Sequence, residues 1–406
     1  MNSSRSHLPS LLSALLFIVA ALLFFSIALL MGVTALGTFF AGKDVGAQQT
    51  ILLVVFAFEG LILLGTTFIS FQRFLNKPLA EQDSSFNIPT WLVATAVLVA
   101  GLSLLIGYQI VESGTANWLL LPILTLPAVV LPLFVVLGLG IRKLPLGTRW
   151  QSWNVFGLAM TLSPFILIFL EVIALSVIVL IVILIVMTQP GFEAQIQRLS
   201  QQILVLDPQS MAAQRLIAPY LVRPEVIAVA LLYFAMIVPM LEEIFKPLGV
   251  WFFANKLTSP AQGFALGALS GSAYALVETF GVSAQTADWA GLLLSRIGTG
   301  ILHITTSALM GAAIVYAIRE RRYLRLLGIY FVSVSLHGLW NTLAIFFAFS
   351  NIANYFELES PFTDIGTSLN VAMAVLVVIL LVILILSNRR IKSTVPIVVA
   401  EESLPQ

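Results

Sequence analysis

Apolar stretches long enough to cross a membrane recur along almost the whole chain. A helix needs about 20 apolar residues to span roughly 30 Å of hydrocarbon. The stretches are continuous and show no alternation of apolar and polar residues, which argues against a transmembrane β-barrel. We therefore predict an all-α polytopic integral membrane protein of about ten transmembrane helices. The predicted spans cover residues 9–33, 50–71, 89–111, 118–141, 160–188, 225–254, 261–282, 291–318, 324–348 and 367–388.

Two of these stretches need comment. The first is longer than the apolar core of a signal peptide and no convincing cleavage site follows it, so we expect a retained span. Residues 153–188 are too long for one ordinary span. We expect this fifth span to begin after Pro164, with residues 153–163 at the inner membrane interface.

Composition excludes several classes of protein. Apolar residues make up 59% of the chain and charged residues 10%, against about 25% charged residues in soluble domains. This excludes a soluble enzyme, a disordered chain and a nucleic-acid-binding protein. The net charge of +1 implies no partner attracted by overall charge, and the absence of cysteine excludes disulfides, thiolate metal sites and cysteine nucleophiles. The lipid bilayer is the expected environment.

Lysine and arginine predict the orientation, because cytoplasmic loops of membrane proteins carry an excess of both. With alternating spans and the N-terminus inside, fifteen of these residues are cytoplasmic and four are outside. We expect a cell-membrane protein with both termini cytoplasmic and residues 189–224 outside. The cytoplasmic residues are Arg5, Arg73, Lys77, Arg142, Lys143, Arg149, Lys246, Lys256, Arg319, Arg321, Arg322, Arg325, Arg389, Arg390 and Lys392.

A basic linker, Arg142–Trp153, suggests the domain organisation. We predict a four-helix module of unknown role at 1–150, a second helical bundle at 151–390 and a short cytoplasmic tail at 391–406. The outer loop 189–224 has two interpretations. Its apolar residues recur at helical spacing, which fits an amphipathic helix on the outer membrane face, but a plain connecting loop fits as well. Those residues are Phe192, Ile196, Leu199 and Ile203.

Ionisable side chains inside spans are costly and by default suggest function. Glu59 and Glu171 stand alone on their helices, and we expect each to be a hydrogen-bonded carboxyl that faces the bundle. Seven others lie on four consecutive helices within 239–345. They are Glu242, Glu243, Lys246, Glu278, Arg296, His303 and His337.

Depth along the helices supports a single site. Counted from cytoplasmic anchors, the Glu or His of each helix lies 13 to 18 residues in, or about 20 to 27 Å at 1.5 Å per residue. This estimate requires the sixth helix to continue to about Lys256, with a bend near Pro239 or Pro247. The pairs of anchor and site residue are Lys256 with Glu243, Pro260 with Glu278, Arg319 with His303, and Arg322 with His337.

The helix faces agree with this arrangement. Small residues at spacings of four form a stripe that allows close helix approach and ends at Glu278. His337 and Asn341 stack on one face, as do Arg296 and His303. Glu242 and Glu243 are adjacent and point about 100° apart. A purely structural alternative is a set of ion pairs, Glu278 with Arg296 and Glu242 with Lys246. The stripe consists of Gly263, Gly267, Gly271 and Ala275.

Four motifs in order resemble a known family. The run Glu242–Lys246 looks like the EExxK motif of PrsW-type intramembrane proteases, which are related to the CAAX prenyl endopeptidases and the bacterial immunity-type membrane proteases. Gly271–Glu278 is similar to their second motif, although Thr279 stands where many members have Asn. Arg296 with His303 resembles the third motif, and His337–Asn341 resembles the fourth, HGxWN. The resemblance covers roughly 225–348, whereas 1–150 matches no known pattern.

The resemblance implies hydrolysis of a peptide bond inside the membrane, and the residue types suit that reaction, which needs a base to activate water and donors for the oxyanion. We expect Glu242 or Glu243 to be the base, with His303 helping to hold the water. His337 and Asn341 would stabilise the oxyanion. Glu278 completes the expected catalytic set, in which it would orient a histidine or pair with Arg296. The supporting residues would be Lys246 and Arg296.

Several questions stay open at this stage. A zinc ion held by Glu243, His303 and His337 is chemically reasonable, but no HExxH helix is present, and we expect no obligatory metal. A proton- or cation-coupled transporter and a catalytically idle membrane scaffold are the alternative functions. For a protease, the family suggests a membrane-tethered substrate such as an anti-sigma factor, or a C-terminally modified peptide.

Overall fold

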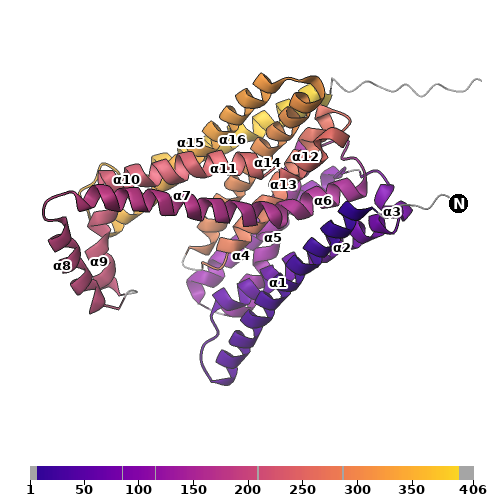
Figure 1. Cartoon of the computed structure of the whole chain (residues 1–406). Coiled ribbons are helices and arrows are strands. Elements are labelled where there is room, and N and C mark those ends of the chain that lie inside the picture. The colour runs from indigo at the N-terminus through magenta and orange to yellow at the C-terminus, as the bar shows by residue number, and fades with distance from the viewer. Residues whose placement is uncertain (1–6, 85, 115, 208–209, 286–287, 393–406) are drawn as a thin grey trace, which may run out of the picture. The chain divides into compact units, whose positions relative to one another are not determined.

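The computed structural model describes residues 7–84, 86–114, 116–207, 210–285 and 288–392 (Figure 1). Within these ranges the chain is helical, without a strand and with one isolated β-bridge between Asp83 and Thr148. The all-α prediction is therefore confirmed. The expected tail 391–406 lies almost entirely outside the described residues, as does Arg5 in the charge count.

Nine segments of the described chain are long and apolar enough to cross a membrane. The tenth expected span, 261–282, forms a 23-residue helix, α13 (Pro260–Val282), which is rich in Gly, Ser and Ala and mostly buried. At about 35 Å it has the length of a span. The nine segments are α1 (Leu8–Phe40), α2 (Ala47–Phe74), α4 (Thr90–Ser113), α5 (Asn117–Gly140), α6–α7 (Arg149–Met187), α10–η2 (Pro224–Lys256), α14 (Trp289–Glu320), α15 (Tyr323–Tyr355) and α16 (Gly366–Lys392).

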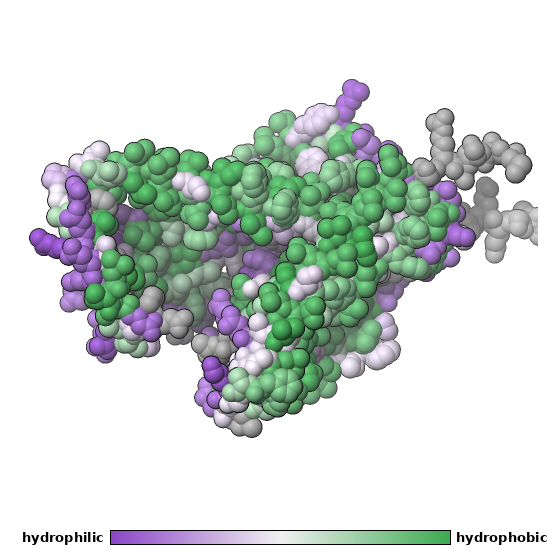
Figure 2. All heavy atoms as spheres, turned by 60° about the horizontal axis from the view of Figure 1, so that its bottom comes forward, coloured by the Kyte–Doolittle hydropathy of each residue, from purple (hydrophilic) through white to green (hydrophobic). Residues whose placement is uncertain are grey.

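The outward faces of these helices are apolar, as a bilayer requires. Leu29 is 68% exposed and Phe165 is 71% exposed, and Figure 2 shows hydrophobic residues over most of the visible surface. Hydrophilic residues gather at the left of that view, over the segment with α8 (Phe192–Leu204) and α9 (Met211–Leu221). The chain is thus a multi-pass membrane protein, and the loop 189–224 contains helices.

The fifth span has the expected interruption. The helix α6 (Arg149–Met160) begins with a capping box, in which Thr148 and Gln151 bond each other's backbone. Thr161 then leaves the helical conformation, with φ −121° and ψ −75°, and α7 (Leu162–Met187) follows, with Pro164 in its first turn.

The contacts divide the chain into two compact units. The first unit comprises Met1–Pro164, Lys246–Ile329 and Leu380–Gln406, and the second comprises Phe165–Phe245 and Tyr330–Ile379. The predicted division by function near residue 150 stays a prediction.

At the centre of the first unit lies α14, from Gly298 to Ala317 almost entirely buried. It packs along α13 and is also contacted by α4 and α5. The side chain of Trp289 shows how tight these contacts are: its indole N–H donates to Thr125 on α5 at 3.2 Å. The ring also fills the space that a side chain at Gly107 on α4 would need.

The second unit is built from α7, the sixth span and α15. Ile178 on α7 packs with Tyr233 and Val238 on the sixth span. That span consists of α10 (Pro224–Ala230), a π-helical segment η1 (Leu231–Ile237) and α11 (Val238–Phe245). After a turn at Lys246 and Pro247, α12 (Leu248–Phe253) and η2 (Ala254–Lys256) complete the helical run to Lys256 that the depth estimate required.

Candidate active site

A stripe of glycines sets α13 against α14 in the first unit. A Cβ atom added at Gly267 would collide with the Ser307 carbonyl oxygen, and one at Gly271 would collide with the His303 carbonyl oxygen. Gly263 meets Gly311 in the same way. The contacts recur every four residues on both antiparallel helices, as the small-residue stripe predicted. This close approach brings Glu278 of α13 next to the polar residues of α14.

Glu278, Arg296, His303 and Lys246 form one connected network, which we call the Glu278 network. Glu278 Oε2 lies 2.6 Å from Arg296 Nη2 and 2.6 Å from His303 Nε2. The other ring nitrogen, His303 Nδ1, lies 2.9 Å from Lys246 Nζ. Because an ammonium group only donates, Nδ1 accepts and Nε2–H donates to the carboxylate. The expected pair of Glu278 with Arg296 is confirmed, and both ring nitrogens of His303 have protein partners.

Three further residues complete this network. The Tyr274 ring lies edge-on to the His303 ring at 5.3 Å, and Lys246 Nζ lies 5.8 Å from the Tyr274 ring centre. Ser270 Oγ donates to the Lys246 carbonyl at 2.6 Å, and Arg296 Nε donates to Thr279 Oγ1 at 3.4 Å. A sequence signal for Ser270 and Tyr274 was present, since both precede Glu278 at steps of four on one helix face.

In the second unit, Glu242, Glu243 and His337 form the paired-glutamate cluster. Glu243 Oε1 lies 2.9 Å from His337 Nδ1, and Glu242 Oε2 lies 3.8 Å from His337 Nε2. All three side chains are buried, with exposed fractions of 0%, 6% and 2% for Glu243, Glu242 and His337. The two adjacent glutamates thus approach opposite ring nitrogens of one histidine, which the expected 100° between them allows.

One ring nitrogen of His337 is held by a carboxylate. A carboxylate accepts, so Nδ1–H donates to Glu243 Oε1. A histidine held this way by a carboxylate is the usual arrangement for a metal ligand or a catalytic imidazole. The other ring nitrogen, Nε2, lies on the side of Glu242.

The π-helical segment explains the position of Asn341. In η1 the Val238 N–H bonds the Tyr233 carbonyl, so the next carbonyl, that of Phe234, would need the N–H of residue 239. That residue is Pro239, which has none. Asn341 Nδ2 fills the gap and donates to the Phe234 carbonyl at 2.7 Å. The amide group has a second hydrogen, so this bond leaves one for a substrate.

Close packing also explains why the same motif has a glycine at position 338. A Cβ atom at Gly338 would collide with the Ala235 carbonyl oxygen. Tyr330 on the same helix donates through its hydroxyl to the Met240 carbonyl at 2.9 Å. The helix α15 therefore follows the backbone of the sixth span closely from Met240 to Phe234.

The structure thus arranges the predicted site residues in two groups, one in each unit. Glu278, Arg296, His303 and Lys246 are joined in the first unit, while Glu242, Glu243 and His337 are joined in the second with Asn341 on the same helix face. That both groups surround one cavity stays a prediction. Of the two lone carboxyls, Glu59 is buried at 1% exposure, and within the described chain its Oε1 has no hydrogen-bond partner, so the expected hydrogen bond is not found there. At Glu171 it is the main-chain carbonyl that accepts from the Tyr233 hydroxyl, at 3.1 Å.

Comparison with known proteins supplies the family. Residues 166–385 match a family described as PrsW family intramembrane metalloprotease, which is 220 of the 406 residues. The matched region contains both groups of site residues. Neither a curated protein nor a solved structure matches the chain. Because more than half of its length fits the family, including all four motifs on successive helices, this chain belongs to the PrsW family of intramembrane metalloproteases.

Proposed function

We propose that this intramembrane peptidase hydrolyses a peptide bond with a water molecule activated by Glu242. One observation carries the proposal: Glu242 Oε2 lies 3.8 Å from the Nε2 atom of His337, whose other ring nitrogen is held by Glu243. A separation of 3.8 Å is too long for a hydrogen bond but suits a bridging third group. A water molecule there would touch a carboxylate base and an imidazole lone pair.

The surroundings favour this chemistry. The Glu242 and Glu243 side chains are buried, and a carboxylate without its hydration shell is a stronger base than one in water. Glu243 would act as a positioning residue, because its bond to Nδ1 fixes the ring and the tautomer of His337. The remaining amide hydrogen of Asn341 would stabilise the oxyanion.

The Glu278 network would support the same reaction site. Lys246 follows Glu243 by three residues, so their Cα atoms are at most about 11 Å apart along the chain. Lys246 binds His303, and His303 binds Glu278. On this proposal, the network holds a positive charge and an oriented imidazole close to the paired glutamates, where negative charge develops on the substrate carbonyl.

The donor set also fits the metal implied by the family description. His337 Nε2 and the Glu242 carboxylate would hold a zinc ion, since imidazole and carboxylate are usual zinc ligands and Glu243 supplies the carboxylate behind the histidine. His303 fits less well, because both of its ring nitrogens have protein partners. When bound, zinc supplies Lewis acidity and a more acidic water. Without zinc, Glu242 would accept the proton of the water molecule that bridges it to His337.

For the substrate we propose a membrane-tethered protein segment, for example an anti-sigma-factor-like protein or a C-terminally modified peptide. Two arguments support this substrate class. The first is the family relationship. The second is the expected depth of the four motifs within the spans, since a buried site reaches bonds that lie in or near the bilayer. Substrate fragments that accumulate with the active chain and disappear with an inactive variant would identify it.

The test compares three substitutions of glutamate by glutamine on the sixth span. Glu242→Gln should lower the cleavage rate by about 10² to 10⁴, because glutamine keeps the shape but cannot accept the proton. Glu243→Gln should also lower it, through loss of the His337 orientation. Glu225→Gln is the matched control, since Glu225 is exposed at the start of α10. Purified full-length protein and a membrane-tethered reporter would be used.

The abundance of each variant is measured alongside. A lower cleavage rate at unchanged abundance would indicate that the glutamate acts as a base and does not merely stabilise the fold. The proposal fails if the double variant of Glu242 and Glu243 cleaves the reporter at the wild-type rate. A transporter would instead lose flux and show no cleavage in the wild-type protein.

We also propose that both termini are cytoplasmic, supported by the fifteen-to-four distribution of Lys and Arg. Because the chain lacks cysteine, single cysteines can be introduced without background. Tyr323 is 63% exposed at the start of α15 and should react only with a membrane-permeant reagent. Ser200 on α8 should react with an impermeant one. Labelling of position 323 from outside would refute the orientation.

A further inference from the structure

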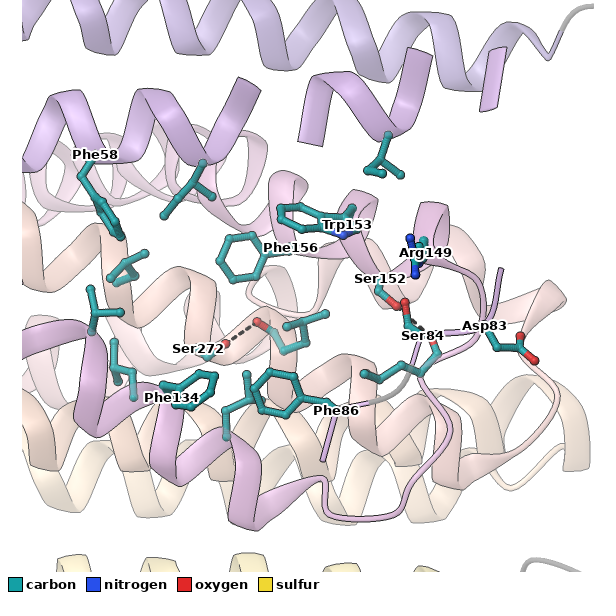
Figure 3. Close-up of a pocket in the computed structure, with 18 residues that line it drawn as sticks. Phe58, Asp83, Ser84, Phe86, Phe134, Arg149, Ser152, Trp153, Phe156 and Ser272 are labelled. Atoms are coloured by element: carbon teal, nitrogen blue, oxygen red, sulfur yellow. Dashed lines mark hydrogen bonds between the residues drawn. The ribbon is translucent and has the colours of Figure 1, made fainter. Parts of the chain in front are cut away.

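The first unit contains an apolar cavity that the peptidase chemistry does not use. Its volume is about 670 Å³, within the range of roughly 300 to 1,000 Å³ of ligand-binding pockets. The walls come from α2, α5, α6 and α13, and none of the Glu278 network or the paired-glutamate cluster lines it. Figure 3 shows the lining side chains, with aromatic residues such as Phe58, Phe134 and Trp153 around the space.

Four of the five polar residues that line this cavity gather at one end, and the fifth, Ser272, lies nearer Phe134. Asp83, Ser84, Arg149 and Ser152 lie together on one side of Figure 3, whereas Phe58 and Phe134 lie toward the other. Two backbone hydrogen bonds hold the chain at the polar end. The Ser84 N–H donates to the Gly147 carbonyl at 2.7 Å, and the Arg149 N–H donates to the Gln82 carbonyl at 2.8 Å. The cavity is therefore amphiphilic, with an apolar body and a polar mouth.

Arg149 supplies a cation at that mouth. Its side chain is half-buried, and no hydrogen bond or ion pair joins its guanidinium group to another residue in the described part of the chain. The carboxylate of Asp83, also at the mouth, is exposed to solvent. An arginine held next to an apolar cavity with its donors available suits an anionic group, and a planar guanidinium matches phosphate oxygens well.

The length of the cavity fits one leaflet of a bilayer. Its α2 wall runs from Ile69, near the polar end of the helix, to Phe58. The eleven helical steps between these two residues correspond to about 16 Å, close to half of the roughly 30 Å hydrocarbon core. A transmembrane peptide helix 10 Å across would need about 1,250 Å³ over that length, which exceeds the cavity volume. A single acyl chain is the better match.

We propose that this cavity binds one acyl chain of an anionic phospholipid, with the lipid phosphate at Arg149. Apolar burial of the chain supplies most of the binding free energy, and Arg149 supplies the preference for an anionic headgroup. Because Leu269, Ser272 and Leu276 line the cavity from α13, the lipid would pack against the same helix whose glycine stripe holds Glu278 in place. The cavity would thus make the Glu278 network sensitive to the surrounding lipid.

Native mass spectrometry of the full-length protein in detergent tests this proposal, with dioleoyl phosphatidylglycerol and dioleoyl phosphatidylcholine as probes. The wild-type protein should retain one phosphatidylglycerol molecule at detergent conditions that strip other lipids. Val130→Trp, which fills the cavity from α5, should abolish that adduct. Ile123→Trp is the matched control, because Ile123 lies on the same helix, is 60% exposed and does not line the cavity.

The headgroup is tested separately. Arg149→Gln should reduce the preference for phosphatidylglycerol over phosphatidylcholine about fivefold, as expected for one basic residue. Arg142→Gln, an exposed residue after α5, should leave the preference unchanged. Inorganic phosphate should not compete. Competition by inorganic phosphate would mean an anion site without a lipid chain and would overturn the proposal.

A second measurement covers the case in which Val130→Trp fails to fold. Phosphatidylglycerol with a diazirine in its acyl chain is photo-crosslinked to the wild-type protein in nanodiscs. The labelled peptides should contain residues 58–69 and 130–137. Labelling confined to outward faces such as that of Ile123, or equal lipid retention by wild type and a folded Val130→Trp variant, would overturn the proposal.

Discussion

The Glu278 network and the paired-glutamate cluster use the same residue types but balance them differently. The network joins one carboxylate, two cations and one histidine, and both ring nitrogens of His303 have protein partners. In the cluster, two buried carboxylates approach one histidine, and one contact is longer than a hydrogen bond. Residue type therefore does not distinguish them, whereas the ratio of acids to bases does.

On the proposed mechanism, this difference separates a supporting role from a reactive one. The network has more cations than carboxylates and links them through His303, so its loss would cost folding free energy. The cluster brings two carboxylates to one histidine, an arrangement in which a hydrolase would activate water. The following experiments, in order of expected effect, would break or sharpen this distinction.

The largest effect on stability is expected for Glu278→Gln. This change leaves Arg296, which is 14% exposed, without its counter-ion. Breaking a fully buried pair typically costs about 3 kcal/mol, and the cost here should be smaller because the Glu278 side chain is 34% exposed. We expect lower abundance and a lower midpoint of thermal unfolding in detergent. The double variant Glu278→Gln with Arg296→Gln should recover part of the loss. If Glu278→Gln were as stable as wild type but inactive, Glu278 would belong to the reaction centre.

An intermediate effect is expected for Gly267→Ala, which tests how the network is held. Alanine normally stabilises a helix interior by about 1 kcal/mol relative to glycine. At Gly267 its Cβ would collide with the Ser307 carbonyl on α14, so we expect net destabilisation. Gly101→Ala on α4 is the control, since nothing lies within 4 Å of that position. Equal unfolding midpoints for the two variants would contradict the close contact of α13 with α14.

The smallest effect is expected at His7, the one histidine of the chain that belongs to neither group of site residues. Neutral His7 caps α1 by accepting the Ser10 N–H on Nδ1 at 3.3 Å. Burial, followed by the nearby charges of Arg73 and Lys256, lowers the pKa of His7 below its ordinary 6.5. A lowered pKa in the folded state gives a contribution to stability that is present above pH 6.5 and is lost as the pH falls below it.

Thermal unfolding measured at about pH 7.5 and 5.5 would check the His7 cap. His7→Asn should keep the cap and remove this part of the pH dependence. A wild-type protein whose unfolding midpoint rises toward pH 5.5 would contradict the sign of the His7 effect.

Much of the fold followed from the sequence, because long apolar stretches leave few alternatives in a bilayer. The stripe on 263–275 predicted which face of α13 meets a neighbour, since only glycine and alanine at steps of four permit such contact. The partner of α7 was not predictable. That helix is almost entirely apolar, so Glu171 alone marked the face expected toward the bundle, and nothing in the pattern indicated which helix that face would meet.

The site was predictable in its residues but not in its pairings. The carboxylate–guanidinium pair of Glu278 and Arg296 could be expected from charge alone. The bond from Lys246 to His303 could not, because it depends on the turn at Pro247. Asn341 illustrates a different limit: its partner is a backbone carbonyl exposed by π-helical winding, and residues 231–237 read as an ordinary apolar helix with Pro239 as the only hint.

The π-helical segment has a consequence for how this enzyme can vary. Residues 231–237 are wound with more residues per turn than an α-helix, so they accommodate a surplus residue within an otherwise ordinary span. Deleting one residue there would restore regular winding and leave the two flanks close to their present faces, because the wider turns absorb the surplus residue. Deleting one residue from the regular helix α11 would instead rotate what lies on one side of the deletion by about 100° relative to the other. The segment 231–237 can therefore lose a residue without turning Glu242 away from His337, whereas α11 cannot.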